Sequence, residues 1–350
     1  MCGASNVAVR PRRFVTLDAL RGVGAIIVMG GHLGIIVGGY IPLSFALAVD
    51  MFFVLSGFVL AHVYDGRFAS GMTVRQFLKA RILRLYPIYF VGVVLGIISI
   101  FFYNPHLLNI RTGTETTLLS IFALPTPPLP PYRALFPLNG PMWSLFFEFW
   151  IANVLFAVFW KWLRGPILWA VIGVSAVALT ISVLRFHTVE FGWYWPLIIP
   201  GLPRVCFSFF AGVALARYHA THPPKLKVHS LFCLAVFAIV MMAPIKGTLT
   251  PFLQLAAILF VLPALIYWGA EAKEKKPALG RALGDVSYDV YAIHRPLLYI
   301  MVSPIGALPF PHSHKLEALL IQAFFMAVVV VIAWGTSQAI ITARASRRAK

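Results

Sequence analysis

The stretch LNGPMWSLFFEFWIANVLFAVFW, residues 138–160, decides the fold class of this chain. It is apolar almost throughout, it carries the single charge of Glu148, and the next basic residue is Lys161. A run of about 20 apolar residues is long enough to cross a bilayer as an α-helix. Because a charge at that depth costs roughly 2.5–3.5 kcal/mol on insertion, Glu148 is expected to have a partner or a chemical role.

The expected partner is His32, which lies in the equally apolar stretch LDALRGVGAIIVMGGHLGIIVGG (17–39). At a rise of 1.5 Å per residue, His32 lies roughly 17 Å beyond Arg21 and Glu148 roughly 14 Å beyond Asn139. Both side chains are therefore predicted near the middle of a hydrocarbon core of about 30 Å. A buried carboxylate can orient a histidine and raise its basicity. The structural alternative for His32 is a core histidine that bonds a neighbouring carbonyl.

Similar apolar runs recur along the whole chain. Its 350 residues are 60% hydrophobic and 11% charged, whereas a soluble protein is about 25% charged. We predict an all-α integral membrane protein with a bundle of about ten transmembrane helices, in a single domain over residues 1–350 with basic tails at 1–13 and 342–350. The predicted spans are 17–38, 43–63, 83–103, 140–160, 166–184, 197–216, 230–244, 251–270, 286–305 and 316–341.

The formal net charge is +18, and the basic residues behind it are distributed as in a membrane protein, not as in a nucleic-acid-binding protein. Most Lys and Arg residues lie in alternate connections between the apolar runs, which predicts cytoplasmic termini by the positive-inside rule. The first span is too long for a cleavable signal peptide and contains Asp18 and Arg21. The three cysteines have no metal-binding spacing, so we expect no metal site, and no nucleotide-binding glycine motif is present.

Two connecting segments have unusual compositions. The connection 104–139 contains PTPPLPPYRALFP, which predicts irregular or polyproline structure. A long connection of this kind is either a lid over a site or a plain linker. The segment FGWYWP (191–196) could stack on a sugar ring or anchor the chain at the membrane interface. Anchoring is the preferred interpretation, because aromatic residues gather at membrane interfaces.

Three groups of polar residues fall at helical spacing inside or beside the spans. Asp18, Arg21 and His32 share one face of the first span, with an interfacial Asp18–Arg21 ion pair as the structural alternative. Arg81 and Arg84 in RILRLYP (81–87) are three residues apart and could bind phosphate, although spacing alone favours anchoring at the membrane surface.

The third group lies in GDVSYDVYAIHRPL (284–297). Ser287, Tyr291 and His294 share one helical face, and Tyr288 is beside them. Hydrogen bonding between helices is the structural alternative for these side chains.

These motifs together resemble the acyltransferase 3 family of membrane proteins, which O-acylate surface glycans and some small molecules. The resemblance covers nearly the whole chain and rests on five motifs in the same order. They are LDALRGVGAIIVMGGH (17–32), VDMFFVLSGFVL (49–60), RILRLYP (81–87), NGPMWSLFFEFW (139–150) and SYDVYAIHRPL (287–297).

The resemblance implies a multi-pass enzyme of the bacterial cytoplasmic (inner) membrane that transfers an acyl group, acetyl by default, from cytoplasmic acyl-CoA to a hydroxyl of a glycan or related acceptor. It implies His32 and Glu148 as catalytic residues and Arg81 and Arg84 as ligands of the donor phosphates. Acyl-CoA is then a co-substrate, and no cofactor is bound permanently. The other candidate substrate-binding residues are Asp18, Arg21, Asp50, Ser56, Asn139, Trp143, Ser144, Ser287, Tyr288, Tyr291 and His294.

The expected mechanism is general-base catalysis, in which His32 takes the proton of the acceptor hydroxyl. An acyl-His32 intermediate is the second variant. The rival function is a proton-coupled transporter with His32, Glu148, Asp18 and Asp50 as a relay. The sequence leaves the acyl group, the acceptor and the oligomeric state open.

Overall fold

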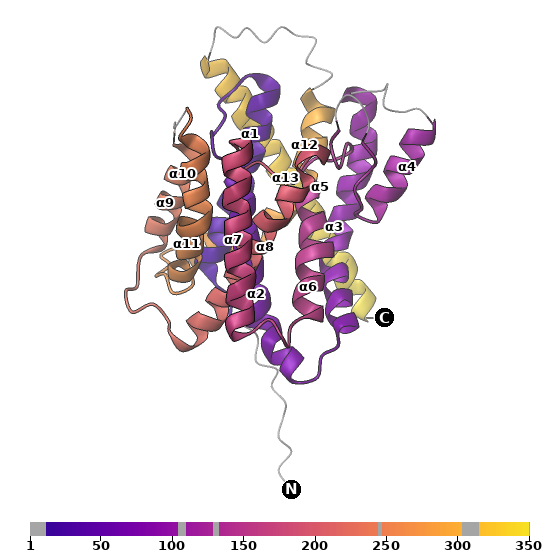
Figure 1. Ribbon diagram of the computed structural model, residues 1–350. Coiled ribbons are helices and arrows are strands. Elements are labelled where there is room, and N and C mark those ends of the chain that lie inside the picture. Colours follow the sequence, from indigo (N-terminus) through magenta and orange to yellow (C-terminus); the bar gives the residue numbers. More distant parts are fainter. Residues whose placement is uncertain (1–11, 104–109, 129–132, 244–246, 303–314, 350) are drawn as a thin grey trace.

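The computed structural model describes residues 12–103, 110–128, 133–243, 247–302 and 315–349. Within these ranges the chain forms helices that run along a common direction, and no β-strand occurs (Figure 1). The longer helices are α1 (Val15–Val37), α2 (Leu47–Ala69), α3 (Val74–Tyr103), α4 (Ile110–Ile121), α7 (Gly165–Phe186), α8 (Ile198–Thr221), α9 (Ser230–Met242), α12 (Pro277–Val302) and α13 (Lys315–Ala349). The prediction of an all-helical protein is confirmed for the described residues.

Two further helices contain a π-helical segment. The first joins α5 (Met142–Phe146) and α6 (Asn153–Val158) through Phe147–Ala152, and the second joins α10 (Thr250–Ala256) and α11 (Leu262–Gly269) through Ala257–Val261. A π-helical segment widens the helix locally and is frequent at functional sites. Glu148 is the second residue of the first such segment.

Seven helices in the described part of the chain are long and apolar enough to cross a membrane. They are Val15–Val37, Leu47–Ala69, Val74–Phe102, Gly165–Phe186, Trp195–Thr221, Thr250–Gly269 and Leu316–Thr342. Several apolar spans confirm a multi-pass membrane protein, but the expected number of about ten is not confirmed.

The other three predicted spans, 140–160, 230–244 and 286–305, are helical but do not meet the same criterion. Met142–Val158 and Ser230–Met242 are apolar but shorter. α12 carries several charged side chains and is not among the seven. Residue 244 and residues 303–305 lie outside the described ranges. An apolar run in the sequence therefore did not define the length of the helix that contains it.

α1 packs most extensively against α12, and α2 against α8. The contact between α2 and α8 is made through Gly57 and Gly212, where the two backbones meet. A Cβ at Gly57 would lie 1.9 Å from the carbonyl oxygen of Phe209, and one at Gly212 would lie 2.0 Å from that of Val54. Small residues permit this approach of membrane helices, and no other residue type fits at these two positions.

The first residues of α1 and the last residues of α13 both lie in the lower half of the bundle in Figure 1. Their placement on the cytoplasmic side stays a prediction. The predicted basic tail 342–350 is instead the last part of α13, which extends to Ala349. Of the other tail, residues 1–11 lie outside the described ranges.

The connection 104–139 is more ordered than its composition predicts. It contains α4, which the sequence reasoning missed, whereas 124–128 and 133–137 are irregular as expected. Backbone hydrogen bonds join Thr126 to Leu135 and Leu135 to Trp193, so this connection is tied to the aromatic segment 191–196. Residues 104–109 and 129–132 lie outside the described ranges.

Candidate active site

Two cavities lie between the helices, and most of the candidate residues line them. The arginine cavity measures about 310 Å³, and Arg21, Arg81, Arg84 and Glu148 lie in its wall. The histidine cavity measures about 290 Å³ and is lined by residues that include His32, Trp143, Trp193, Arg204 and Arg295. Val49 and Tyr291 line both, so the two cavities adjoin at these residues.

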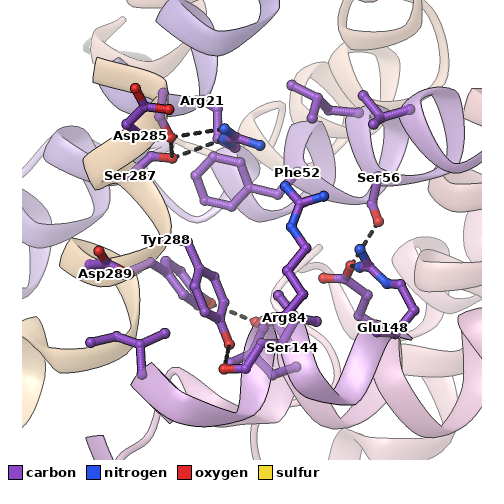
Figure 2. A pocket seen from close by; sticks show the side chains of 18 of the residues that line it. Arg21, Phe52, Ser56, Arg84, Ser144, Glu148, Asp285, Ser287, Tyr288 and Asp289 are labelled. Atoms are coloured by element: carbon purple, nitrogen blue, oxygen red, sulfur yellow. Dashed lines mark hydrogen bonds and ion pairs between the residues drawn. The ribbon is translucent and has the colours of Figure 1, made fainter. Parts of the chain in front are cut away.

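Glu148 lies in the arginine cavity and has partners other than His32 (Figure 2). Its Oε1 accepts hydrogen bonds from Nη2 of Arg81 at 2.8 Å and from the hydroxyl of Ser56 at 2.7 Å. The prediction that Glu148 pairs with His32 is therefore wrong. Helical spacing gave the depth of both groups, but depth does not tell which helix faces which.

The three arginines of the arginine cavity differ in their charge partners. Arg81 pairs with Glu148, and Arg21 pairs with Asp18 at 3.0 Å. Arg21 also donates to the hydroxyl of Ser287 at 2.9 Å. No carboxylate in the described ranges pairs with Arg84, whose side chain Figure 2 shows extending into the cavity. Of the three arginines in this cavity, Arg84 is therefore the most available to an anionic ligand.

The Asp18–Arg21 ion pair expected as the structural alternative is present, and Asp18 also contacts Arg13 at 2.5 Å. Asp18 does not line the arginine cavity. Its contribution there is to position Arg21.

His32 pairs with a second histidine. Its Nδ1 lies 2.8 Å from Nε2 of His294, and the two rings stack at an interplanar angle of 9°. Nδ1 of His294 lies 2.8 Å from the carbonyl oxygen of Tyr291 and 3.1 Å from that of Val290. Because a carbonyl oxygen only accepts, this Nδ1 carries the ring proton of His294.

The tautomer of His32 follows from that contact. In a neutral His294 ring Nε2 is an acceptor, so the proton shared by the two rings belongs to Nδ1 of His32. The lone pair of His32 is then on Nε2, for which the described residues provide no hydrogen-bond partner. His32 thus has the tautomer of a base without the help of a carboxylate.

Tyr291 and Ser144 lie at the boundary between the cavities. Their hydroxyls are 2.7 Å apart, and both contact the carbonyl oxygen of Pro141 at 3.1 Å. The ring of Tyr291 packs edge-on against Phe52 at 5.6 Å. These contacts hold Tyr291 as part of the partition between the arginines and His32.

Asp50 was expected to bind substrate, but it lines neither cavity. It is fully buried, and its two oxygens accept from Nε and Nη2 of Arg204 at 2.9 and 2.6 Å. Sequence reasoning missed Arg204, although an arginine inside the apolar span 197–216 gives the same signal as Glu148. A substrate has no access to Asp50 in this arrangement.

The remaining candidates are divided between the cavities and the packing around them. Ser56, Ser144, Ser287 and Tyr288 line the arginine cavity, and Trp143 lines the histidine cavity. Asn139 is buried and donates to the carbonyl oxygen of Ala292 at 2.8 Å, so it ties the segment before α5 to α12, outside both cavity walls.

Further residues of the histidine cavity were not predicted as site residues. They include Glu190, Trp193, Arg295 and Tyr299. Trp193 belongs to the aromatic segment 191–196, for which stacking on a sugar was the less favoured prediction and anchoring at the membrane interface the preferred one. Arg295 stands inside the quoted motif SYDVYAIHRPL and directly follows His294, so its charge was the signal that could have found it.

Comparison with known proteins agrees with the motifs. A family model described as an acyltransferase domain matches residues 14–338. Protein 2 in the picA locus of Rhizobium radiobacter is 36% identical over 50% of this chain and 97% of its own length. The exopolysaccharide production protein ExoZ of Rhizobium meliloti is 27% identical over 71% of this chain and 75% of its own length.

Peptidoglycan O-acetyltransferase OatA of Listeria monocytogenes is 26% identical over 90% of this chain, but the match covers only 54% of OatA. No solved structure matches the chain. Because the family model covers most of the sequence and the motifs line two adjoining cavities, the chain belongs to the acyltransferase 3 family.

Proposed function

We propose that this protein transfers an acyl group, acetyl by default, from acyl-CoA to a hydroxyl of a glycan at the cytoplasmic membrane of a bacterium. The observation that carries the proposal is the pair of adjoining cavities, one lined by arginines and the other by His32 and aromatic side chains. Two reactants that enter from separate ends would meet at Tyr291 and Val49. The printed names of two relatives, a peptidoglycan O-acetyltransferase and an exopolysaccharide production protein, favour a glycan acceptor.

The donor occupies the arginine cavity in this proposal. Phosphates suit arginine, because its planar guanidinium offers two parallel donors. Arg84 makes the first contact, since Arg21 and Arg81 are already paired with carboxylates. Arg81 contributes to phosphate binding when a donor phosphate replaces Glu148 as its partner. Glu148 thereby acts through Arg81 and not through His32.

The acceptor hydroxyl occupies the histidine cavity. Nε2 of His32 removes its proton as the oxygen attacks the thioester carbonyl, and His294 is the positioning residue that keeps the lone pair on Nε2. The tetrahedral intermediate then collapses, the C–S bond breaks, and the CoA thiolate leaves with a proton from the imidazolium. General-base assistance of this kind is typically worth 10²–10⁴ in rate.

In the second variant, Nε2 of His32 attacks the carbonyl itself and forms an acyl-imidazole before the acceptor arrives. Both variants use the same lone pair and the same partner, so His32→Ala stops both. Rapid mixing with acyl-CoA alone separates them, because only the acyl-His32 variant gives a burst of CoA without acceptor.

The transporter interpretation requires a proton relay through His32, Glu148, Asp18 and Asp50. In the structure these groups have separate partners: His294, Arg81, Arg21 and Arg204, respectively. Asp50 is in addition sealed from both cavities. A continuous relay gains no support from this arrangement.

The experiment uses purified protein in detergent with radiolabelled acetyl-CoA, in which CoA release is followed with and without a crude surface-glycan fraction. We expect glycan-stimulated release by the wild type and a loss of at least about 100-fold in His32→Ala. His222→Ala is the matched control, because His222 is exposed and lines neither cavity. Near-normal turnover by His32→Ala would refute the mechanism, and absence of binding and release with several acyl-CoAs would favour the transporter.

A further inference from the structure

Arg295 is a charged residue of the histidine cavity that the proposed chemistry does not use. It lies on α12 directly after His294, is half-buried, and lines the cavity together with His32. Its Nη1 packs on the backbone of Gly140, where an added Cβ would lie 2.2 Å from that nitrogen. The side chain is therefore held at the cavity wall and does not extend into open solvent.

No carboxylate pairs with Arg295 within the described ranges. The chain has 11 Asp and Glu residues, and all of them fall inside those ranges, so the remaining segments provide no further acidic side chain. The side-chain hydrogen bonds of Arg295 go from Nε and Nη2 to the uncharged hydroxyl of Tyr299, at 3.3 and 3.2 Å.

A comparison with Arg204, which lines the same cavity, shows how unusual this is. Arg204 is neutralised by both oxygens of Asp50 and donates to the carbonyl oxygens of Phe191 and Ala46. A charge among membrane helices is costly, and one without a counter-ion points to a ligand that supplies it. A guanidinium fits a planar carboxylate with two parallel hydrogen bonds.

The other residues of the cavity indicate what carries that carboxylate. Trp143 is buried in the wall of the cavity, and Trp193, which is 42% exposed, presents aromatic surface. Glu190 adds a carboxylate that can accept hydrogen bonds from hydroxyl groups. Aromatic faces with convergent polar groups suit a sugar ring, and a guanidinium beside them suits an acid group on that sugar.

We propose that the histidine cavity selects an acidic glycan as acceptor, with Arg295 bound to a carboxylate of the saccharide near the hydroxyl that is acylated. This inference rests on the proposed function and adds the charge class of the acceptor. Arg295 is a specificity-determining residue in it, distinct from the groups that handle the acyl donor in the other cavity.

The test compares an oligosaccharide that contains uronic acid with the same oligosaccharide after its carboxyl groups are reduced to alcohols. With acetyl-CoA as donor, the wild type should prefer the acidic form at least tenfold in kcat/KM. Arg295→Gln should abolish that preference by raising KM for the acidic form, and leave the reduced form unchanged. Arg295→Lys should restore part of it. Arg185→Gln, in which the altered arginine lies outside both cavities, should behave as the wild type.

Each other outcome overturns the inference in a recognisable way. Equal use of both acceptors by the wild type leaves the acyltransferase intact and removes the acidic preference. An equal fall of kcat for both acceptors in Arg295→Gln assigns Arg295 to the oxyanion of the transition state instead. No turnover with either form removes this inference together with the proposed function.

A binding measurement keeps the inference falsifiable if the variants lose activity through poor folding. Quenching of tryptophan fluorescence by the two oligosaccharides, without donor, reports occupation of the cavity that contains Trp143 and Trp193. The wild type should bind the acidic form at least tenfold more tightly. Equal affinities would overturn the inference regardless of any variant.

Discussion

Two arginine–carboxylate pairs lie inside the bundle, and their surroundings differ. In the Asp50–Arg204 pair the side chains are 0% and 1% exposed, whereas in the Glu148–Arg81 pair they are 16% and 6% exposed and both line the arginine cavity. The Asp50–Arg204 pair joins α2 to α8, and we call it the sealed pair because Asp50 lines neither cavity, although Arg204 lines the histidine cavity. The difference shows that an ion pair inside the bundle serves architecture where its carboxylate is closed off from both cavities, and is open to chemistry where both of its partners line one.

The largest effect is expected for the sealed pair. Arg204→Met leaves the Asp50 carboxylate buried without a counter-ion, which costs about 3–5 kcal/mol. We expect a large fall in the midpoint of thermal unfolding in detergent. Asp50→Leu combined with Arg204→Met should recover much of the loss, because an apolar replacement of a whole buried pair is often tolerated. If the single Arg204→Met variant is as stable as the wild type, the Asp50–Arg204 pair does not have the structural role that distinguishes it from the Glu148–Arg81 pair.

A smaller effect on stability and a clear effect on function are expected for the cavity pair. Arg81→Gln removes a charge-assisted hydrogen bond, but water in the arginine cavity can solvate Glu148, so the loss of stability should be about 1–3 kcal/mol. KM for acyl-CoA should rise roughly tenfold, which corresponds to about 1.4 kcal/mol.

Arg84→Gln is the matched variant for that measurement, since Arg84 has no carboxylate partner in the described ranges. It should raise KM for acyl-CoA without lowering the unfolding midpoint. If Arg81→Gln instead unfolds the protein as readily as Arg204→Met and leaves KM unchanged, both pairs are structural.

The smallest effect is expected at the membrane surface, for Arg12 and Glu271. Arg12 is 55% exposed, and such exposed pairs contribute about 0.2–1 kcal/mol. The hydrogen bond from Arg12 lowers the pKa of Glu271 from its ordinary value. A lowered carboxyl pKa stabilises the fold above the pKa of the unfolded chain, and the contribution is lost as the pH falls through the folded value.

Arg12→Ala should therefore lower the unfolding midpoint slightly at neutral pH, and the difference should shrink as Glu271 takes up its proton. High salt should shrink it as well, because exposed charges are screened. A difference that persisted at low pH would place the contribution of Arg12 in packing, such as its contact with Phe14.

Several parts of the site could be predicted from the sequence. The apolar run around Glu148 indicated a charge in need of a partner, and the motifs marked Arg21, Arg81, Arg84, Ser287 and Tyr288 as candidate substrate-binding residues. They line one cavity. Local chemistry carries this information, because hydropathy and helical spacing depend on residues that are close in the chain.

Only the tertiary structure determined which buried side chains pair with each other. Glu148 pairs with Arg81, 67 residues away, and His32 pairs with His294, 262 residues away. Spacing gives each side chain a depth and a face on its own helix, but the order of helices around the bundle is set by close contacts such as Gly57 against Phe209. Such contacts depend on the shapes of both surfaces at once. For that physical reason the sequence predicted a membrane bundle with buried charges, while only packing determined that His32 has a histidine, not a carboxylate, beside it.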